Sequence, residues 1–270
     1  MSAPSKNENT STPKNIVLLE KENAVAWVTM NRPESLNSLT AELCAALKAA
    51  LAECEADGDI RVVVFAGEGK AFCAGGDLRT ILELADYEAA RRYVRAAGEI
   101  TAAVTGSKKP YIAMVGGAAA GAGFNLALAC DFICASKRAK FTQAFSSIGL
   151  ISDCGGNLLL PRLVGPHAAK RLMMLPETLS AEAAQRLGLV SELADGEALR
   201  ERTAALAARL AKQPPLALAQ IKKLLNGGEE LADILRAEED IQAKLIIGED
   251  CKEGVRAFFE KREAAFKGRS

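Results

Sequence analysis

The chain has 270 residues, in which 34 Lys and Arg balance 34 Asp and Glu, and it contains one histidine. A net charge of zero gives no general attraction to phosphate backbones or anionic bilayers, so we expect no nucleic acid and no membrane as a partner. One imidazole, that of His167, leaves no histidine-rich metal site, and we expect no metal.

Residues 1–15 are rich in Ser, Thr, Asn, Pro and Lys, and they predict a disordered leader. After this leader the apolar pattern alternates between strands and helices. The predicted strands are residues 16–19, 24–30, 61–66, 111–115, 132–135 and 139–141. The predicted helices in the first 155 residues are 41–55, with Thr40 as its cap, 78–85, 87–105, and one that follows residue 123 and ends near 130.

From residue 155 onward the pattern is mostly helical. Alternating strands and helices followed by helices predict an α/β core over residues 16–194 and a helical C-terminal region over residues 195–270. These last helices are amphipathic, so they must cover the core or a neighbouring subunit. Residues 111–130 carry no charge, but their glycines favour a strand, a loop and a buried helix over a membrane span.

The seven cysteines form no Cys-x-x-Cys pair, and several stand in apolar runs. An odd number of unclustered cysteines favours reduced, buried thiols over disulfides or a zinc site. We therefore expect a cytoplasmic protein.

Two glycine-rich loops, residues 67–77 and 116–123, each follow a predicted buried strand and lead into a helix. Glycine lets the backbone turn with positive φ and lets a ligand approach the main chain, and a helix N-terminus offers unpaired N–H groups. Two such loops could direct two backbone donors at one oxygen, as in an oxyanion hole. Tight packing of small residues explains the loops equally well. A dinucleotide-binding pattern is less well supported, because Leu126 stands where its third glycine would be.

Asp153 stands in an apolar segment directly before Cys-Gly-Gly. Aspartate is a preferred helix cap, and taken alone this is the simpler interpretation. Apolar surroundings would also disfavour the ionised carboxyl, which suits general acid/base chemistry. His167 falls in the first turn of a helix opened by Pro166 and is interpreted as a surface residue. Lys222 and Lys223 are interpreted as part of a solvated helix face.

In combination and order, several motifs resemble those of the enoyl-CoA hydratase/isomerase (crotonase) family. The resemblance covers about residues 16–268 and is highly specific. The motifs are Met-Asn-Arg-Pro-Glu-Ser-Leu-Asn at 30–37, Phe-Cys-Ala-Gly-Gly-Asp-Leu at 72–78, Lys-Pro-Tyr-Ile-Ala-Met-Val-Gly-Gly-Ala-Ala-Ala-Gly-Ala-Gly at 109–123, Ala-Cys-Asp-Phe at 129–132 and Gly-Val-Arg-Ala-Phe-Phe-Glu-Lys-Arg at 254–262.

The resemblance implies a crotonase-like spiral of ββα units whose C-terminal helices mediate trimerisation, giving a homotrimer or a hexamer built as a dimer of trimers. It implies an acyl-CoA thioester as substrate, and no cofactor beyond the coenzyme A of that substrate. The backbone N–H groups of Ala74 and Ala122 would form the oxyanion hole around the thioester carbonyl. The other residues implied to contact the substrate are Ser35, Leu36, Gly76, Asp77, Leu78, Gly121, Gly123 and Phe145.

The chain departs from the hydratases of the family at their two catalytic glutamates, where it has Asn125 and the segment Gln143-Ala-Phe145. The segment around Asp153 resembles the branch of phenylacetate-pathway ring-opening isomerases, in which an Asp at this position is catalytic. The resemblance therefore favours an acyl-CoA isomerase that moves a C=C bond through a thioester enolate, with Asp153 as acid and base. Two alternatives stay open: an enoyl-CoA or cyclic dienoyl-CoA hydratase, and a non-catalytic acyl-CoA-binding member of the family.

Overall fold

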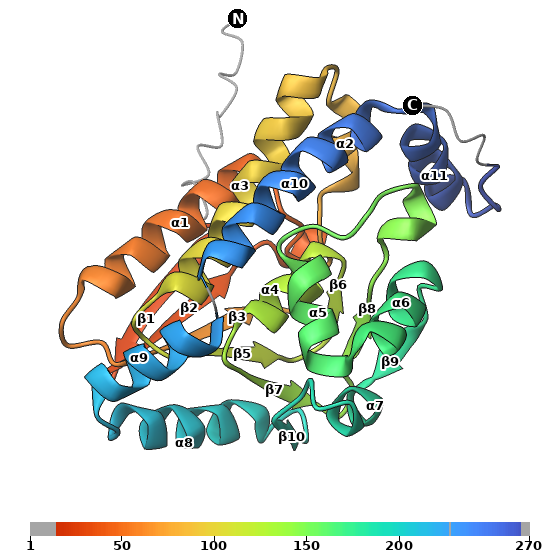
Figure 1. Cartoon of the computed structure of the whole chain (residues 1–270). Coiled ribbons are helices and arrows are strands. Elements are labelled where there is room, and N and C mark those ends of the chain that lie inside the picture. Colours follow the sequence, from red (N-terminus) through yellow and green to blue (C-terminus); the bar gives the residue numbers. More distant parts are fainter. Residues whose placement is uncertain (1–14, 227, 266–270) are drawn as a thin grey trace, which may run out of the picture.

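A computed structural model describes residues 15–226 and 228–265, so the predicted leader lies outside the described residues except for Asn15. Two β-sheets and the helices that cover them form the structure (Figure 1). The larger sheet has the strand order β1-β2-β3-β5-β7-β10, and the smaller has the order β4-β6-β8-β9. Only the pairs β1–β2 and β8–β9 are antiparallel among these strands.

The strands of the larger sheet are β1 (Val17–Glu22), β2 (Val25–Met30), β3 (Val62–Gly67), β5 (Tyr111–Val115), β7 (Phe132–Ser136) and β10 (Glu192–Ala194). Those of the smaller sheet are β4 (Ala71–Cys73), β6 (Ala118–Ala120), β8 (Lys140–Thr142) and β9 (Thr178–Ser180). The helices are α1 (Ala41–Ala56), α2 (Leu78–Glu83), α3 (Tyr87–Gly106), α4 (Ala122–Ala129), α5 (Gly156–Val164), α6 (Pro166–Met174), α7 (Ala181–Arg186), α8 (Leu199–Ala211), α9 (Pro215–Asn226), α10 (Gly228–Ile247) and α11 (Glu249–Glu260).

The sequence of strand β3 is continuously apolar because both of its faces are covered. Val63 and Phe65 point into the main core, whereas Val62 and Val64 point to the opposite face, where Leu199 and other residues of α8 cover them. Successive side chains of a strand alternate between faces, so a sheet covered on both sides needs apolar residues at every position. Figure 1 shows α8 lying along this sheet.

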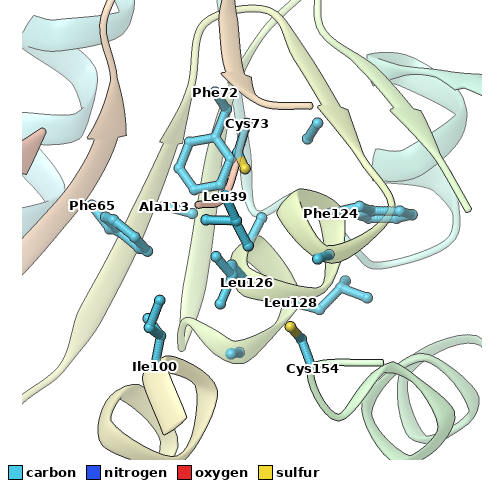
Figure 2. Packing of buried hydrophobic residues seen from close by; sticks show 14 of the residues in the cluster. Leu39, Phe65, Phe72, Cys73, Ile100, Ala113, Phe124, Leu126, Leu128 and Cys154 are labelled. Atoms are coloured by element: carbon cyan, nitrogen blue, oxygen red, sulfur yellow. The ribbon is translucent and has the colours of Figure 1, made fainter. Parts of the chain in front are cut away.

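The main core brings together segments that are far apart in the chain. Figure 2 shows Leu39, Phe72, Phe124 and Cys154 packed in one cluster with residues of α4. The rings of Phe65 and Phe72 meet edge to face, with their centroids 5.5 Å apart. This packing joins the two glycine loops to the segment that carries Asp153.

The predicted long elements are present, but four short strands were missed. Thr40 caps α1 by accepting a hydrogen bond from the Leu43 N–H at 3.2 Å, as predicted. Strands β4, β6, β9 and β10 have three residues each. A three-residue strand shows no readable alternation, so β4 was hidden inside the predicted glycine loop.

The expectation that Lys222 lies on a solvated helix face is wrong. Its side chain is 5% exposed and pairs with Asp131, with 2.8 Å between Nζ and Oδ2. The same ammonium group donates to the Lys109 carbonyl oxygen at 2.9 Å and lies 4.7 Å from the centre of the Tyr111 ring. Lys223, by contrast, is exposed, and so is His167. Lys222 therefore anchors α9 to the N-terminal ends of strands β5 and β7.

None of the helices within residues 15–226 and 228–265 combines the length and apolar character needed to cross a bilayer. In the same residues, no cluster of three or more His, Cys, Asp or Glu side chains could hold a metal ion. All seven cysteines are buried and unpaired.

Candidate active site

The two glycine loops lie side by side because β4 pairs with β6. Cys73 is the register partner of Ala119 in this parallel pair. A Cβ atom at Gly75 would stand 2.8 Å from the Ala120 carbonyl oxygen and 3.4 Å from the Ala122 nitrogen. A Cβ at Gly123 would stand 2.2 Å from the Cys73 carbonyl oxygen. Glycine at these two positions is what allows the loops to approach each other so closely.

Ala122 is the first residue of α4, after Gly121 with φ of 50°. Its N–H has no acceptor within the part of the chain that the structure describes. Three or four such N–H groups stand free at a helix N-terminus, where the helix dipole favours negative charge. The ring of Phe145 lies 3.6 Å from the position of a Cβ at Gly121. The structure thus places the predicted donor, Ala122, and Phe145 at the same helix start.

Ala74 lies next to Ala122 in the paired loops, but its N–H is engaged. It donates to the Leu36 carbonyl oxygen at 3.0 Å. Leu36 and Asn37 both adopt left-handed backbone conformations, with φ of 53° and 57°. Asn37 is fully buried, and its side-chain amide donates to the carbonyl oxygens of Glu68 and Ala71 at 3.0 and 2.9 Å. A ligand oxygen at Ala74 would share or replace the Leu36 carbonyl.

The residues expected to border the coenzyme A chain lie in two adjoining segments. Ser35 and Leu36 precede Ser38, whose hydroxyl donates to Asp77 Oδ2 at 2.8 Å. Asp77 also caps α2, because its Oδ1 accepts the Thr80 N–H at 3.0 Å. Although burial raises its pKa, these hydrogen bonds hold the pKa of Asp77 below the ordinary value. The carboxylate of Asp77 therefore stabilises the loop and is not available as a base.

Gly76 and Leu78 flank Asp77 within the same turn. A Cβ at Gly76 would stand 3.0 Å from the Tyr93 hydroxyl oxygen. That hydroxyl accepts the Asp77 N–H and donates to the Leu39 carbonyl oxygen, both at 2.8 Å. Tyr93 of α3 thus fixes the turn from behind.

Asp153 is a buried carboxyl that is only partly hydrogen-bonded. Its Oδ2 accepts the Gln242 side-chain N–H at 3.4 Å, and its Oδ1 has no partner among the described residues. Burial raises the pKa of this carboxyl to about 6, above its ordinary range. A carboxyl with a free oxygen and such a pKa can both accept and return a proton near neutral pH.

Asn125 connects Asp153 to the N-terminus of α4. Its side-chain amide donates to the Asp153 carbonyl oxygen at 2.7 Å and to Ser152 Oγ at 2.9 Å, and its Oδ1 accepts the Gln143 amide at 2.7 Å. Asn125 is three residues after Ala122 and therefore stands on the same face of the helix. The structure thus connects Ala122 and Asp153 through Asn125, which stands at the position of one hydratase glutamate, and links Asn125 to Gln143 of the segment that replaces the other.

Helix α10 supplies two site residues that the sequence interpretation missed. Gln242 contacts Ile151 and Asp153, and Glu238 accepts the Gly155 N–H at 2.8 Å. Burial and the nearby Asp153 carboxyl raise the pKa of Glu238 to about 7. Both residues stand at positions of the helix that are otherwise apolar and buried, as Leu231 and Ile246 are. A polar residue in the apolar stripe of an amphipathic helix was the available signal.

Two clefts open elsewhere on the molecule. One, of about 490 Å³, is lined by apolar side chains of α5 and α9 together with Lys222 and Asp131. The other, of about 230 Å³, lies between α3 and α10 and includes Glu238 and Cys154. Neither cleft contains Asp153, Ala74 or Ala122 among its lining residues.

Residues 20–269 match the family described as enoyl-CoA hydratase/isomerase. The chain belongs to this family. One relative, the 1,2-epoxyphenylacetyl-CoA isomerase of Escherichia coli strain K12, is 39% identical over 94% of this chain and 98% of its own length. Another, the crotonyl-CoA hydratase of Syntrophomonas wolfei, is 35% identical over 93% of this chain and 97% of its own length.

Solved structures of the enoyl-CoA hydratase/isomerase family confirm the predicted crotonase-like fold. An enoyl-CoA hydratase from Mycobacterium avium subsp. paratuberculosis superimposes with a TM-score of 0.85 at 31% identity, over 93% of this chain and 98% of that one. An enoyl-CoA hydratase/isomerase from Pseudoalteromonas atlantica gives a TM-score of 0.83 at 33% identity, over 93% and 100%. Since relatives include both isomerases and hydratases, family membership places the chain among the enoyl-CoA hydratase/isomerase enzymes and leaves its reaction to the site residues.

Proposed function

We propose that the chain is an acyl-CoA isomerase in which Asp153 is the acid and base. The observation that carries this proposal is the buried Asp153 carboxyl, with an unpartnered Oδ1 and a pKa raised to about 6. Asn125 and Phe145 cannot exchange protons at the positions where the hydratases of the family carry glutamates. One carboxyl suffices to move a proton between two carbons, whereas hydration classically uses two groups and a placed water.

The reaction would begin with the thioester carbonyl at the N–H groups of Ala122 and Ala74, with the Leu36 carbonyl giving way as acceptor. Asp153 takes a proton from the carbon next to the carbonyl of a β,γ-enoyl-CoA, and the electron pair moves onto the thioester oxygen to give an enolate. The enolate collapses while Asp153 returns the proton to the γ-carbon, so the double bond moves to the α,β-position. Each backbone donor of such a hole contributes about 3 kcal/mol to stabilising the developing charge.

The likeness to a 1,2-epoxyphenylacetyl-CoA isomerase supports an isomerase and suggests a cyclic acyl group among the substrates to be tried. The test is incubation with linear β,γ-enoyl-CoAs, 1,2-epoxyphenylacetyl-CoA and crotonyl-CoA, followed by ultraviolet spectra and mass analysis of the chromatographically separated products. Isomerisation leaves the mass unchanged, and hydration adds one water. We expect products of unchanged mass, and we expect Asp153→Asn to abolish turnover while acyl-CoA still binds.

The hydratase alternative is supported by hydratases among the relatives, and would use Asp153 to activate water. A product heavier by one water that disappears in Asp153→Asn would favour it over isomerisation. Binding of acyl-CoA without turnover of any member of the panel would favour the non-catalytic alternative.

We also propose that the chain forms a homotrimer or a hexamer and works in the cytoplasm without a cofactor. Large apolar side chains on α9 and α11 are exposed in the single chain, among them Leu216, Leu224 and Phe258 at 82%, 80% and 62%. An interface between copies would remove such surface from water. Light scattering of the purified protein measures the assembly, and a monomer would contradict it.

A further inference from the structure

The segment from Ile151 to Asn157 has few regular hydrogen bonds of its own. It connects a 3₁₀ turn to α5, and Cys154 and Gly155 in it have φ of 49° and 75°. A left-handed conformation is unfavourable for a residue with a side chain, as Cys154 is, so external contacts must hold this backbone. Asn125 holds it from the side of α4, through the Asp153 carbonyl oxygen.

Helix α10, which follows this segment in the sequence whereas Asn125 precedes it, also holds the segment. The side-chain amide of Gln242 donates to the Ile151 carbonyl oxygen at 3.0 Å and accepts the Ile151 N–H at 3.2 Å. One turn earlier, Glu238 accepts the Gly155 N–H at 2.8 Å and the Asn157 side-chain N–H at 3.1 Å. The two side chains bracket Asp153, two residues before it and two after it.

Both side chains are buried, with Glu238 at 3% and Gln242 at 1% exposure. Burying a carboxyl and an amide is unfavourable unless they are well hydrogen-bonded, and apolar residues at these positions would cost less. Helix α10 is itself fixed on α3, where Arg95 pairs with Glu239; Figure 1 shows the two helices running along each other. Because α10 is fixed in this way, Glu238 and Gln242 can hold the segment in one position.

We propose that Glu238 and Gln242 are positioning residues that hold Asp153 from helix α10, leaving Oδ1 as the oxygen that exchanges the proton. This inference rests on the proposed function of Asp153. Gln242 reaches the carboxyl itself, since its Nε2 also donates to Asp153 Oδ2. Because that bond stabilises the ionised form, removing it raises the pKa of Asp153.

The charged and titratable groups near Asp153 and the pair lie on α1, α3, α10 and the segment itself. They are Cys44 of α1, Tyr93, Arg95 and Glu99 of α3, Cys154 of the segment, and Arg236 and Glu239 of α10. The burial of Cys44, Tyr93 and Cys154 raises the pKa of each, so these three groups stay neutral when Asp153 titrates near pH 6. Glu238, with a pKa of about 7, titrates in the same range as Asp153, so the contact with Gln242 is read from the difference between the Gln242 and Glu238 variants.

The test uses the full chain with Gln242→Met, which keeps the length of the side chain but removes its hydrogen bonds. Glu238→Gln removes the charge and keeps one acceptor, and Asp233→Asn makes the same carboxylate-to-amide change at an exposed residue of the same helix, whose side chain is 69% exposed. The carboxyl stretch of Asp153, isolated as the infrared difference between each protein and its Asp153→Asn counterpart, gives its apparent pKa without substrate. Steady-state kinetics with the fastest substrate of the panel give kcat and KM.

For Gln242→Met we expect the Asp153 pKa to rise by about one unit and kcat to fall by about tenfold or more, with KM changed less than about threefold. Glu238→Gln should lower kcat by a smaller factor, and Asp233→Asn should leave the kinetics and the Asp153 pKa as they are. An unchanged pKa together with an unchanged kcat in Gln242→Met overturns the proposal. If Gln242→Met does not fold, the same comparison of Glu238→Gln with Asp233→Asn decides, and equal effects overturn it.

A failure of the proposed function gives a different result. In that case Asp153→Asn keeps its turnover, while Gln242→Met still raises the Asp153 pKa. Loss of turnover in Asp153→Asn, combined with no effect of either α10 variant, contradicts the positioning role alone.

Discussion

The side-chain amide of Asn125 donates a hydrogen bond of 2.7 Å to the carbonyl oxygen of Asp153. This bond joins the helix that presents the Ala122 N–H to the segment that carries the candidate base. The position of the Ala122 N–H relative to the Asp153 carboxyl is therefore fixed by the packed core and not by a surface loop.

The first prediction concerns this bond. Asn125→Ala should lower the free energy of unfolding by about 2 to 4 kcal/mol, because it leaves buried groups of Asp153, Ser152 and Gln143 without their partner. Urea denaturation followed by circular dichroism measures the change. A loss below about 0.5 kcal/mol would show that water or a neighbouring side chain replaces the amide.

The pH dependence of activity follows from the raised pKa of Asp153. The base must be ionised to take a proton, so kcat/KM should rise with pH and level off above the pKa of about 6. The profile of kcat/KM from pH 4.5 to 8.5 tests this. An acidic limb near pH 4, the ordinary carboxyl range, would contradict the burial of the charged form.

The same pKa makes Asp153 a destabilising residue at neutral pH. Burial raises the folded-state pKa from 3.8 to about 6, so the unfolded chain loses its proton first and the contribution to stability falls as pH rises from about 4 to 6. Asp153→Asn should therefore raise the free energy of unfolding at pH 7.5 by about 2 to 3 kcal/mol, and by much less at pH 4. Equal effects at both pH values would contradict this account.

Gly75→Ala should separate the two backbone donors. The residue has φ of 94°, and its Cβ would stand 2.8 Å from the Ala120 carbonyl oxygen, so the loops must move apart. Displacing a donor of an oxyanion hole lowers kcat by about 100-fold or more. Gly58→Ala, where a Cβ meets nothing within 4 Å, is the matched control. Comparable kcat values in the two variants would argue against a role for this loop pair.

The pair of Lys222 with Asp131 leads to a prediction about the stability of the fold that does not involve the candidate active site. Lys222→Met removes one partner of the buried pair with Asp131 and should cost about 3 kcal/mol. Lys223→Met, at the exposed neighbour, should change the free energy of unfolding by less than about 0.5 kcal/mol. Thermal and urea unfolding compare the two, and similar stability in both would show that the pair contributes nothing net.

The sequence predicted the long elements because their signals are local. Thr40 before a periodic apolar stretch indicates the start of α1, and the apolar run at residues 61–66 indicates a strand covered on both faces. The loops around Ala74 and Ala122 were identified from glycines whose small size is required by a contact between segments. The role of Asp153 as a candidate base came from the resemblance to ring-opening isomerases together with its apolar surroundings, and the structure shows that its side chain is buried and that Gly155 stands at the cap position of α5.

The α10 contacts could not be predicted because they depend on tertiary packing. Glu238 and Gln242 interrupt the apolar stripe of α10, but only the docking of α10 on α3 sets Gly155 and Ile151 as their partners. The engaged N–H of Ala74 was equally hidden, since it depends on the left-handed turn at Leu36. The expectation of an exposed Lys222 was wrong for the same reason, since nothing near it in the sequence indicates that its ammonium group pairs with Asp131.

The late position of α10 has a consequence for synthesis. The loops of Ala74 and Ala122 and the Asp153 segment leave the ribosome well before residues 238 and 242 do. A nascent chain can therefore assemble its sheets and core while the candidate base is still held from one side only. The site is completed only once α10 has been translated, so fragments that stop short of it should fold in part and show no enzyme activity.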